Sequence, residues 1–230
     1  MTPPLRYLQS NGPAYGWLLA STTLVSCILI GHHPIPVIPI ADGHDPARGL
    51  QNIVALGGPE RWMHSAMILI VLLLTTGFSG FAWRLGVAHP LVMAGWLSQV
   101  LGAAAMIGAA LIDGFVIPDV ASRGIAEGGN PAGIYDLIAL CGAWLQADTK
   151  LGFVLMALSA VFFGHALLHH KGGALWIGLL GIGVGGFSAI YVLTLTARFN
   201  PPLLLAYMTA QAAWHLTVAF WMIRRLKRPE

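Results

Sequence analysis

The chain has 230 residues, of which 57% are hydrophobic and only 9% are charged, and its mean hydropathy is +0.73. A soluble globular domain is about 45–50% apolar and about 25% charged. Too little polar surface is present to cover a water-soluble body of this size, which excludes a soluble enzyme, a disordered chain and a secreted disulfide scaffold. We expect an all-α, polytopic integral membrane protein that forms a single transmembrane domain over residues 1–230 in the cell membrane.

Six apolar runs are long enough to cross a membrane as helices, which requires about 17–25 residues. No Lys, Asp or Glu lies in the interior of any run. The sequence therefore predicts a bundle of six transmembrane helices, at residues 14–30, 62–83, 91–112, 151–168, 174–197 and 203–223.

Two of the predicted connections are long, Gly31–Arg61 and Gly114–Lys150, and most of the acidic residues lie in or beside them. In the second connection, apolar residues recur at helical spacing from Ile134 to Leu145. This stretch is too short to span, so it predicts a short interfacial helix in the second long outer loop. A short helix that caps the bundle is the alternative.

The orientation follows from the basic residues. With six spans, both termini share one side, and the short connections of that side carry most of the cations, including Arg84, Lys171 and Arg224. The positive-inside rule then predicts that both termini are cytoplasmic. We therefore attribute the basic C-terminal end to membrane orientation, and we expect no nucleic-acid partner. The expected partners are membrane lipid and either a second copy of the chain or other membrane subunits.

The fifth predicted span is rich in glycine. Gly181 and Gly185 are four residues apart, and Gly178 lies on the same helix. Small residues at this spacing let helix backbones approach closely in lipid. The pattern predicts a packing surface.

Histidine and carboxylate side chains gather at the predicted outer ends of the first three spans. His32 and His33 end the first span, His64 lies near the start of the second, and Asp113 ends the third. Imidazole and carboxylate are suitable ligands for Zn, Cu(II) or Fe. We predict a divalent transition-metal site at His33, His64 and Asp113, with His32 as the competitor of His33. Alternatively, these histidines bind water and headgroups, and Asp113 caps a helix or pairs with Arg61 or Arg123.

A second histidine group lies toward the inner half of the membrane. His165 and His169 are i and i+4 on the fourth span, so they share a helix face, and His215 lies at a similar depth on the sixth. These positions suit the binding of haem b or of a buried metal. The alternative is that His169 and His170 are solvated or bind lipid phosphate together with Lys171.

Two short motifs resemble known families. His165-Ala-Leu-Leu-His169-His170 resembles one histidine box of the membrane desaturases and hydroxylases. That resemblance implies a di-iron site built from several boxes, and the sequence has no second box. Gly77-Phe78-Ser79-Gly80 resembles the serine motif of rhomboid intramembrane proteases, which would make His215 a base. Here the motif lies on the second span, whereas the rhomboid motif lies on the fourth.

The histidines favour a membrane protein that binds a metal or haem for redox or metal-dependent chemistry. A small transporter or channel is the alternative, in which His64, Asp113 and His215 serve proton or ion passage. A third possibility is an assembly subunit of a membrane complex. The sequence does not identify catalytic residues.

Overall fold

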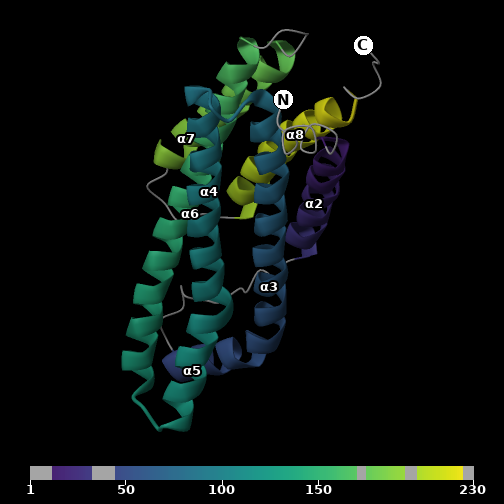
Figure 1. Cartoon of the computed structure of the whole chain (residues 1–230). Coiled ribbons are helices and arrows are strands. Elements are labelled where there is room, and N and C mark those ends of the chain that lie inside the picture. Colours follow the sequence, from purple (N-terminus) through teal and green to yellow (C-terminus); the bar gives the residue numbers. More distant parts are fainter. Residues whose placement is uncertain (1–11, 33–44, 170–174, 195–200, 225–230) are drawn as a thin grey trace.

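The computed structural model describes residues 12–32, 45–169, 175–194 and 201–224. All regular elements in these ranges are helical, as predicted, and no strand occurs among them (Figure 1). In chain order they are α2 (Gly12–His32), α3 (Pro46–Leu85), α4 (Pro90–Leu111), the π-helical turn η2 (Ile112–Val116), α5 (Ile117–Ala126), α6 (Pro131–Leu168), α7 (Leu175–Thr194) and α8 (Pro201–Arg224).

Five helical stretches of the described chain are long and apolar enough to cross a membrane. They are α2, α3, the continuous stretch from α4 to α5, α6 and α7. This supports a multi-pass membrane protein. The last helix, α8, is not among the five, and it carries the polar residues Gln211 and His215. The sixth span, the cell membrane as location and the orientation of the termini stay predictions.

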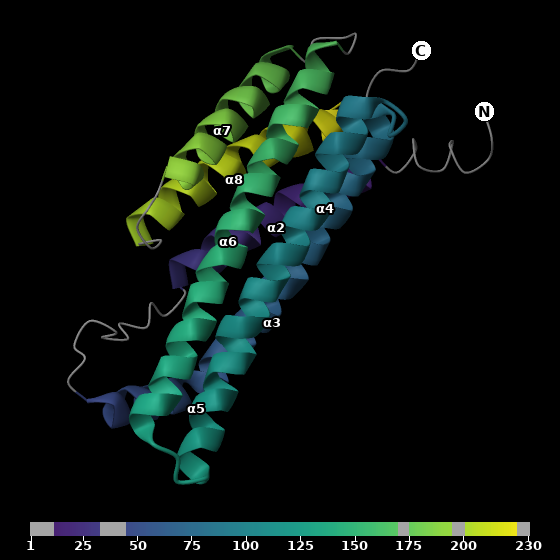
Figure 2. The ribbon, with the colours of Figure 1, turned by 90° about the vertical axis from the view of Figure 1, so that its left-hand side faces the viewer.

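Two helices are much longer than a bilayer is thick. α3 has 40 residues and α6 has 38, which correspond to about 60 Å and 57 Å at the α-helical rise. The hydrocarbon core of a membrane is only about 30 Å thick. In Figure 2, α3, α4 and α6 run side by side and continue past α2, α7 and α8 toward α5. If these helices cross a membrane, their far ends extend beyond it.

We call this far end the helical projection: residues 46–61 of α3, all of α5, and residues 131–148 of α6. It has its own hydrophobic core, in which Leu50 and Ile53 of α3 pack with Ile117 and Ala121 of α5. An ion pair between Arg61 and Asp119 joins α3 to α5 at the surface. Its charged side chains and separate core suit an environment outside the hydrocarbon layer.

The two long connections of the sequence prediction are mostly helical. Pro46 to Arg61 is the first part of α3, and within Gly114–Lys150 only the turn at 127–130 separates two helices. The predicted interfacial helix is instead the first part of α6, with Ile134 and Ile138 against the core of the projection. The apolar-run criterion missed these segments because it detects contact with lipid, whereas their helices are stabilised by packing on each other.

A second core lies where α3, α6 and α8 meet. The rings of Phe78 and Phe163 stack with centroids 6.0 Å apart, and both belong to the same buried cluster as Trp214. At one end of this core, Arg84 Nη1 donates a hydrogen bond to the carbonyl oxygen of Met222, 2.8 Å away. The guanidinium also lies beside Gly12. The start of α2 and the end of α8 therefore lie at the same end of the molecule.

Three of the glycine residues of α7 face α6 and form the predicted packing surface. A Cβ atom added at Gly185 would lie 2.3 Å from the carbonyl oxygen of Ala157, and one at Gly178 would lie 2.7 Å from that of Gly164. By contrast, a Cβ at Gly183 would meet no atom within 4 Å. Gly178, Gly181 and Gly185 thus allow the two backbones to touch.

Replacing Gly185 with Ala should force α7 away from α6, because the new methyl group meets rigid backbone. We expect a loss of about 1–3 kcal/mol in unfolding free energy, measured as a lower midpoint of thermal unfolding in detergent. Gly183→Ala on the same helix is the matched control and should leave the midpoint unchanged or raise it. Equal effects of the two substitutions would contradict this packing.

Reporter insertions after Arg84 and after Arg123 should localise to opposite faces of the membrane. Arg84 ends α3, and Arg123 lies near the far end of the continuous stretch Pro90–Ala126. That stretch is about 55 Å long at the α-helical rise, which exceeds the bilayer core. If both reporters localise to one face, this stretch does not cross the membrane.

Candidate metal site

His64 lies where α3 enters the helical projection. It is about 32 Å along the helix axis from Leu85, the last residue of α3. Asp113 lies about 35 Å along its own helical stretch from Pro90. Since the hydrocarbon core is about 30 Å thick, a bilayer that begins at the Arg84 end would end near both residues. His64 and Asp113 therefore share one level at the edge of the apolar region.

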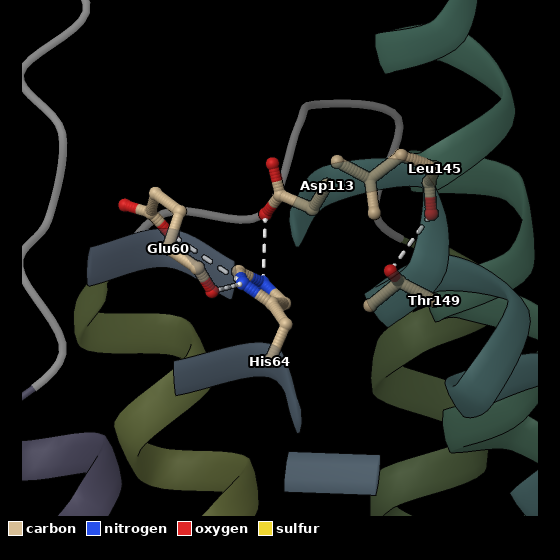
Figure 3. Close-up of polar contacts among 5 residues, drawn as sticks. All are labelled: Glu60, His64, Asp113, Leu145 and Thr149. Carbon is tan, nitrogen blue, oxygen red and sulfur yellow. Dashed lines mark hydrogen bonds and ion pairs between the residues drawn. The ribbon is translucent and has the colours of Figure 1, made fainter. Parts of the chain in front are cut away.

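The two side chains are in contact (Figure 3). His64 Nε2 lies 3.2 Å from Asp113 Oδ2, and the histidine side chain is only 3% exposed. On the other side of the ring, Nδ1 lies 2.9 Å from the backbone carbonyl oxygen of Glu60 and 3.4 Å from the Oε2 atom of its carboxylate. Asp113 is different, because its side chain is 41% exposed. The imidazole is thus held from both sides, while one carboxylate reaches the surface.

The carbonyl of Glu60 determines which ring nitrogen carries the hydrogen. A carbonyl oxygen only accepts hydrogen bonds, so the contact assigns the donor hydrogen to Nδ1. In the neutral imidazole, Nε2 then presents its lone pair to the carboxylate of Asp113. Two acceptor atoms at 3.2 Å repel each other unless a proton or a cation lies between them. The geometry is therefore suited to holding a positive charge.

The backbone of η2 brings Asp113 to His64. Within Ile112–Val116 the helix widens to a π-turn, and the N–H of Ile117 bonds to the carbonyl oxygen of Ile112. The next residue, Pro118, has no N–H with which to continue the normal ladder. Single π-turns of this kind are frequent at functional sites. Here the turn places Asp113 and Gly114 directly against α3.

Gly114 permits the close approach. A Cβ atom at this position would lie 2.4 Å from the Cβ of His64 and 2.7 Å from its Cγ. Any larger residue would displace the imidazole. The π-turn and the glycine together explain why the histidine is buried against backbone.

The third predicted ligand is not tested. His33 lies outside the described residues, and His32 is the last residue of α2 but its side chain is not described. Among the side chains that the structure does describe, no group of three or more His, Cys, Asp or Glu could hold a metal. Arg61 pairs with Asp119, so it is not the partner of Asp113 that the alternative interpretation offered.

Glu60 was not among the predicted site residues. It lies one helical turn before His64, which is the i, i+4 spacing, and the residue is only 8% exposed. The predicted second span begins at Trp62, which leaves Glu60 in the preceding connection. A prediction that began this helix before Glu60 would have placed Glu60 and His64 on the same helix face.

The inner histidines occupy two different environments. His165 and His169 are exposed on α6, and their ring centroids are 5.3 Å apart, as expected for a shared face. His215 is buried on α8, where its ring lies against the edge of Phe78 at 4.9 Å. The structure thus brings His165 and His169 together at the surface and places His215 in the interior. Haem binding by these residues stays a prediction.

Ser79, in the motif that resembles rhomboid proteases, has local partners. Its hydroxyl donates to the carbonyl oxygen of Thr75 at 2.8 Å and accepts a hydrogen bond from Trp96 Nε1 at 3.0 Å. The first contact lies within α3, and the second joins α3 to α4. They give Ser79 a structural role within the described chain.

Comparison with known proteins adds no family assignment. No family model, no curated protein and no solved structure matches this chain.

Replacing Gly114 with Ala should expose His64. In the native protein the buried ring should resist acylation by diethyl pyrocarbonate, whereas the exposed His165 and His169 react and act as internal controls. The added methyl group displaces the imidazole, so peptide mass spectrometry should detect modified His64. Gly58→Ala, where a Cβ meets no atom within 4 Å, is the matched control. Continued protection of His64 in the Gly114→Ala variant would contradict the tight packing.

Proposed function

We propose that this membrane protein binds a divalent transition metal through His64 Nε2 and Asp113 Oδ2, and that the remaining coordination positions serve metal-dependent chemistry at the membrane surface. The observation that carries the proposal is the 3.2 Å separation of the two atoms. Ligands that each lie about 2.0–2.1 Å from a tetrahedral metal are about 3.3 Å apart. The pair is therefore spaced as two ligands of one ion.

The surroundings of His64 match those of a metal ligand. A ligating histidine usually donates its second ring N–H to a carbonyl or carboxylate, which fixes the tautomer and the orientation of the ring. The carbonyl oxygen of Glu60 is at 2.9 Å from Nδ1, in the position for this role. The carboxylate of Glu60 adds negative charge near the site.

The ligand types and the access also fit. One nitrogen and one carboxylate oxygen favour Zn, Fe, Mn or Cu(II) over softer ions. Asp113 is partly exposed, so an ion or a small polar ligand has a route to the pair. His33 is the proposed third protein ligand, and water or a substrate would complete the coordination. A metal with open positions can activate bound water or polarise a substrate.

Isothermal titration of the purified protein with Zn(II), and the visible spectrum with Co(II), test this proposal. We expect one ion per chain, and at least tenfold weaker binding in His64→Gln and in Asp113→Asn, because each removes a ligand. Asp136→Asn is the matched control, since it removes an exposed carboxylate of the helical projection and should leave the affinity unchanged. Comparison of His33→Ala with His32→Ala identifies the third ligand.

Unchanged Zn(II) affinity in both His64→Gln and Asp113→Asn would overturn the proposal. The pair would then share a proton without any metal, which is the arrangement expected of the ion-pathway alternative.

A further inference from the structure

A small, partly open cavity lies in the apolar part of the bundle, lined by residues of α2, α3, α4, α6 and α8. Its volume is about 70 Å³. Four helices each contribute one methionine to its wall, and α8 also contributes a histidine. These residues are Met67, Met106, Met156, Met208 and His215.

The cavity is not purely apolar. Gln211, which is only 4% exposed, lines the wall, and its Oε1 atom has no hydrogen-bond partner within the described part of the chain. Its Nε2 atom reaches only Ser188 Oγ, at 3.5 Å. A buried polar atom without a partner costs free energy, so it favours a polar or charged occupant of the space beside it. No carboxylate, lysine or arginine is among the lining residues that the structure describes.

We propose that this cavity binds a Cu(I) ion through methionine thioethers and the imidazole of His215. Thioether sulfur is a soft ligand and selects Cu(I) among the biological metals, and neutral imidazole is also a copper ligand. All of these ligands are neutral, which suits a monovalent ion. A divalent ion in the apolar interior would need a compensating carboxylate, and the described wall offers none. The volume corresponds to two or three water molecules, which is room for an ion.

This site is separate from the one at His64 and does not depend on it. Met67 lies three residues beyond His64 on α3, or about 4.5 Å along the helix axis. The outer pair offers nitrogen and oxygen, whereas the cavity offers mainly sulfur. Methionine also fills gaps in ordinary cores, so the experiment must distinguish ligation from packing.

Cu(I) binding is measured with the purified full-length protein in detergent, under ascorbate, against the chromophoric competitor bicinchoninate. Cys27 is exposed and Cys141 partly buried, and thiols also bind copper, so both are first replaced by Ser. We expect one Cu(I) per chain, with sulfur and nitrogen ligands in X-ray absorption spectra. Combined Met106→Leu, Met156→Leu and Met208→Leu substitutions keep the volume but remove three sulfurs, and should weaken binding at least tenfold. His215→Gln should remove the nitrogen signal.

Met93→Leu is the matched control, because Met93 is 37% exposed on α4 and does not line the cavity. It should leave the Cu(I) affinity unchanged. If the triple variant does not fold, the single variants Met106→Leu and Met208→Leu replace it, each with a smaller loss. Absence of Cu(I) binding, or equal affinity in the methionine variants and the control, would overturn the proposal. So would loss of Cu(I) binding in His64→Gln, since the copper would then occupy the outer site.

Discussion

The mismatch between helix length and bilayer thickness is the constraint on which the rest of this structure depends. α3 and α6 are about twice as long as the hydrocarbon core they would cross, so each has one part that can span and one part that extends beyond it. The extending parts pack with α5 around a second small core and form the helical projection. The junction between the two parts is where an ionisable group can be buried in protein and still lie near water. His64 and Asp113 occupy that junction, one buried and one partly exposed.

Glycine determines how closely the helices approach, and it does so for two different purposes. At Gly185 the close approach joins α7 to α6 and serves the stability of the bundle. At Gly114 the same kind of contact seats the ring of His64 against the π-turn. The turn then directs the carboxylate of Asp113 at Nε2 of that ring. The packing of α7 and the positioning of His64 therefore have the same physical basis, because glycine has no side chain to hold the neighbouring helix away.

The two proposed sites differ in ligand chemistry because their surroundings differ. At the expected membrane boundary, water and charged neighbours lower the desolvation cost of a carboxylate. Nitrogen and oxygen ligands are therefore both available for a divalent ion there. In the bundle interior a carboxylate would carry a large desolvation cost. The neutral thioethers and imidazole found there suit a softer, monovalent ion. Met67 and His64 lie on the same helix within one turn of each other, so the change of chemistry occurs over a short distance.

The sequence alone determined the properties that follow from composition and local spacing. Too few polar residues indicated a helical membrane protein, and apolar runs located the second halves of α3 and α6. Helical periodicity predicted the shared face of His165 and His169 and the packing role of Gly185. The first part of α6 was predicted only as a separate short helix. The first part of α3 could not be found this way, because it is stabilised by packing against α5 and carries no lipid-facing signal. For the same reason Glu60 was missed. The sequence also placed His64 and Asp113 at the same ends of neighbouring spans. Only the tertiary structure decided that their side chains touch through a π-turn, and that four methionines from four helices line one cavity with His215. Those residues are far apart in the chain, and their meeting depends on long-range packing that no local pattern encodes.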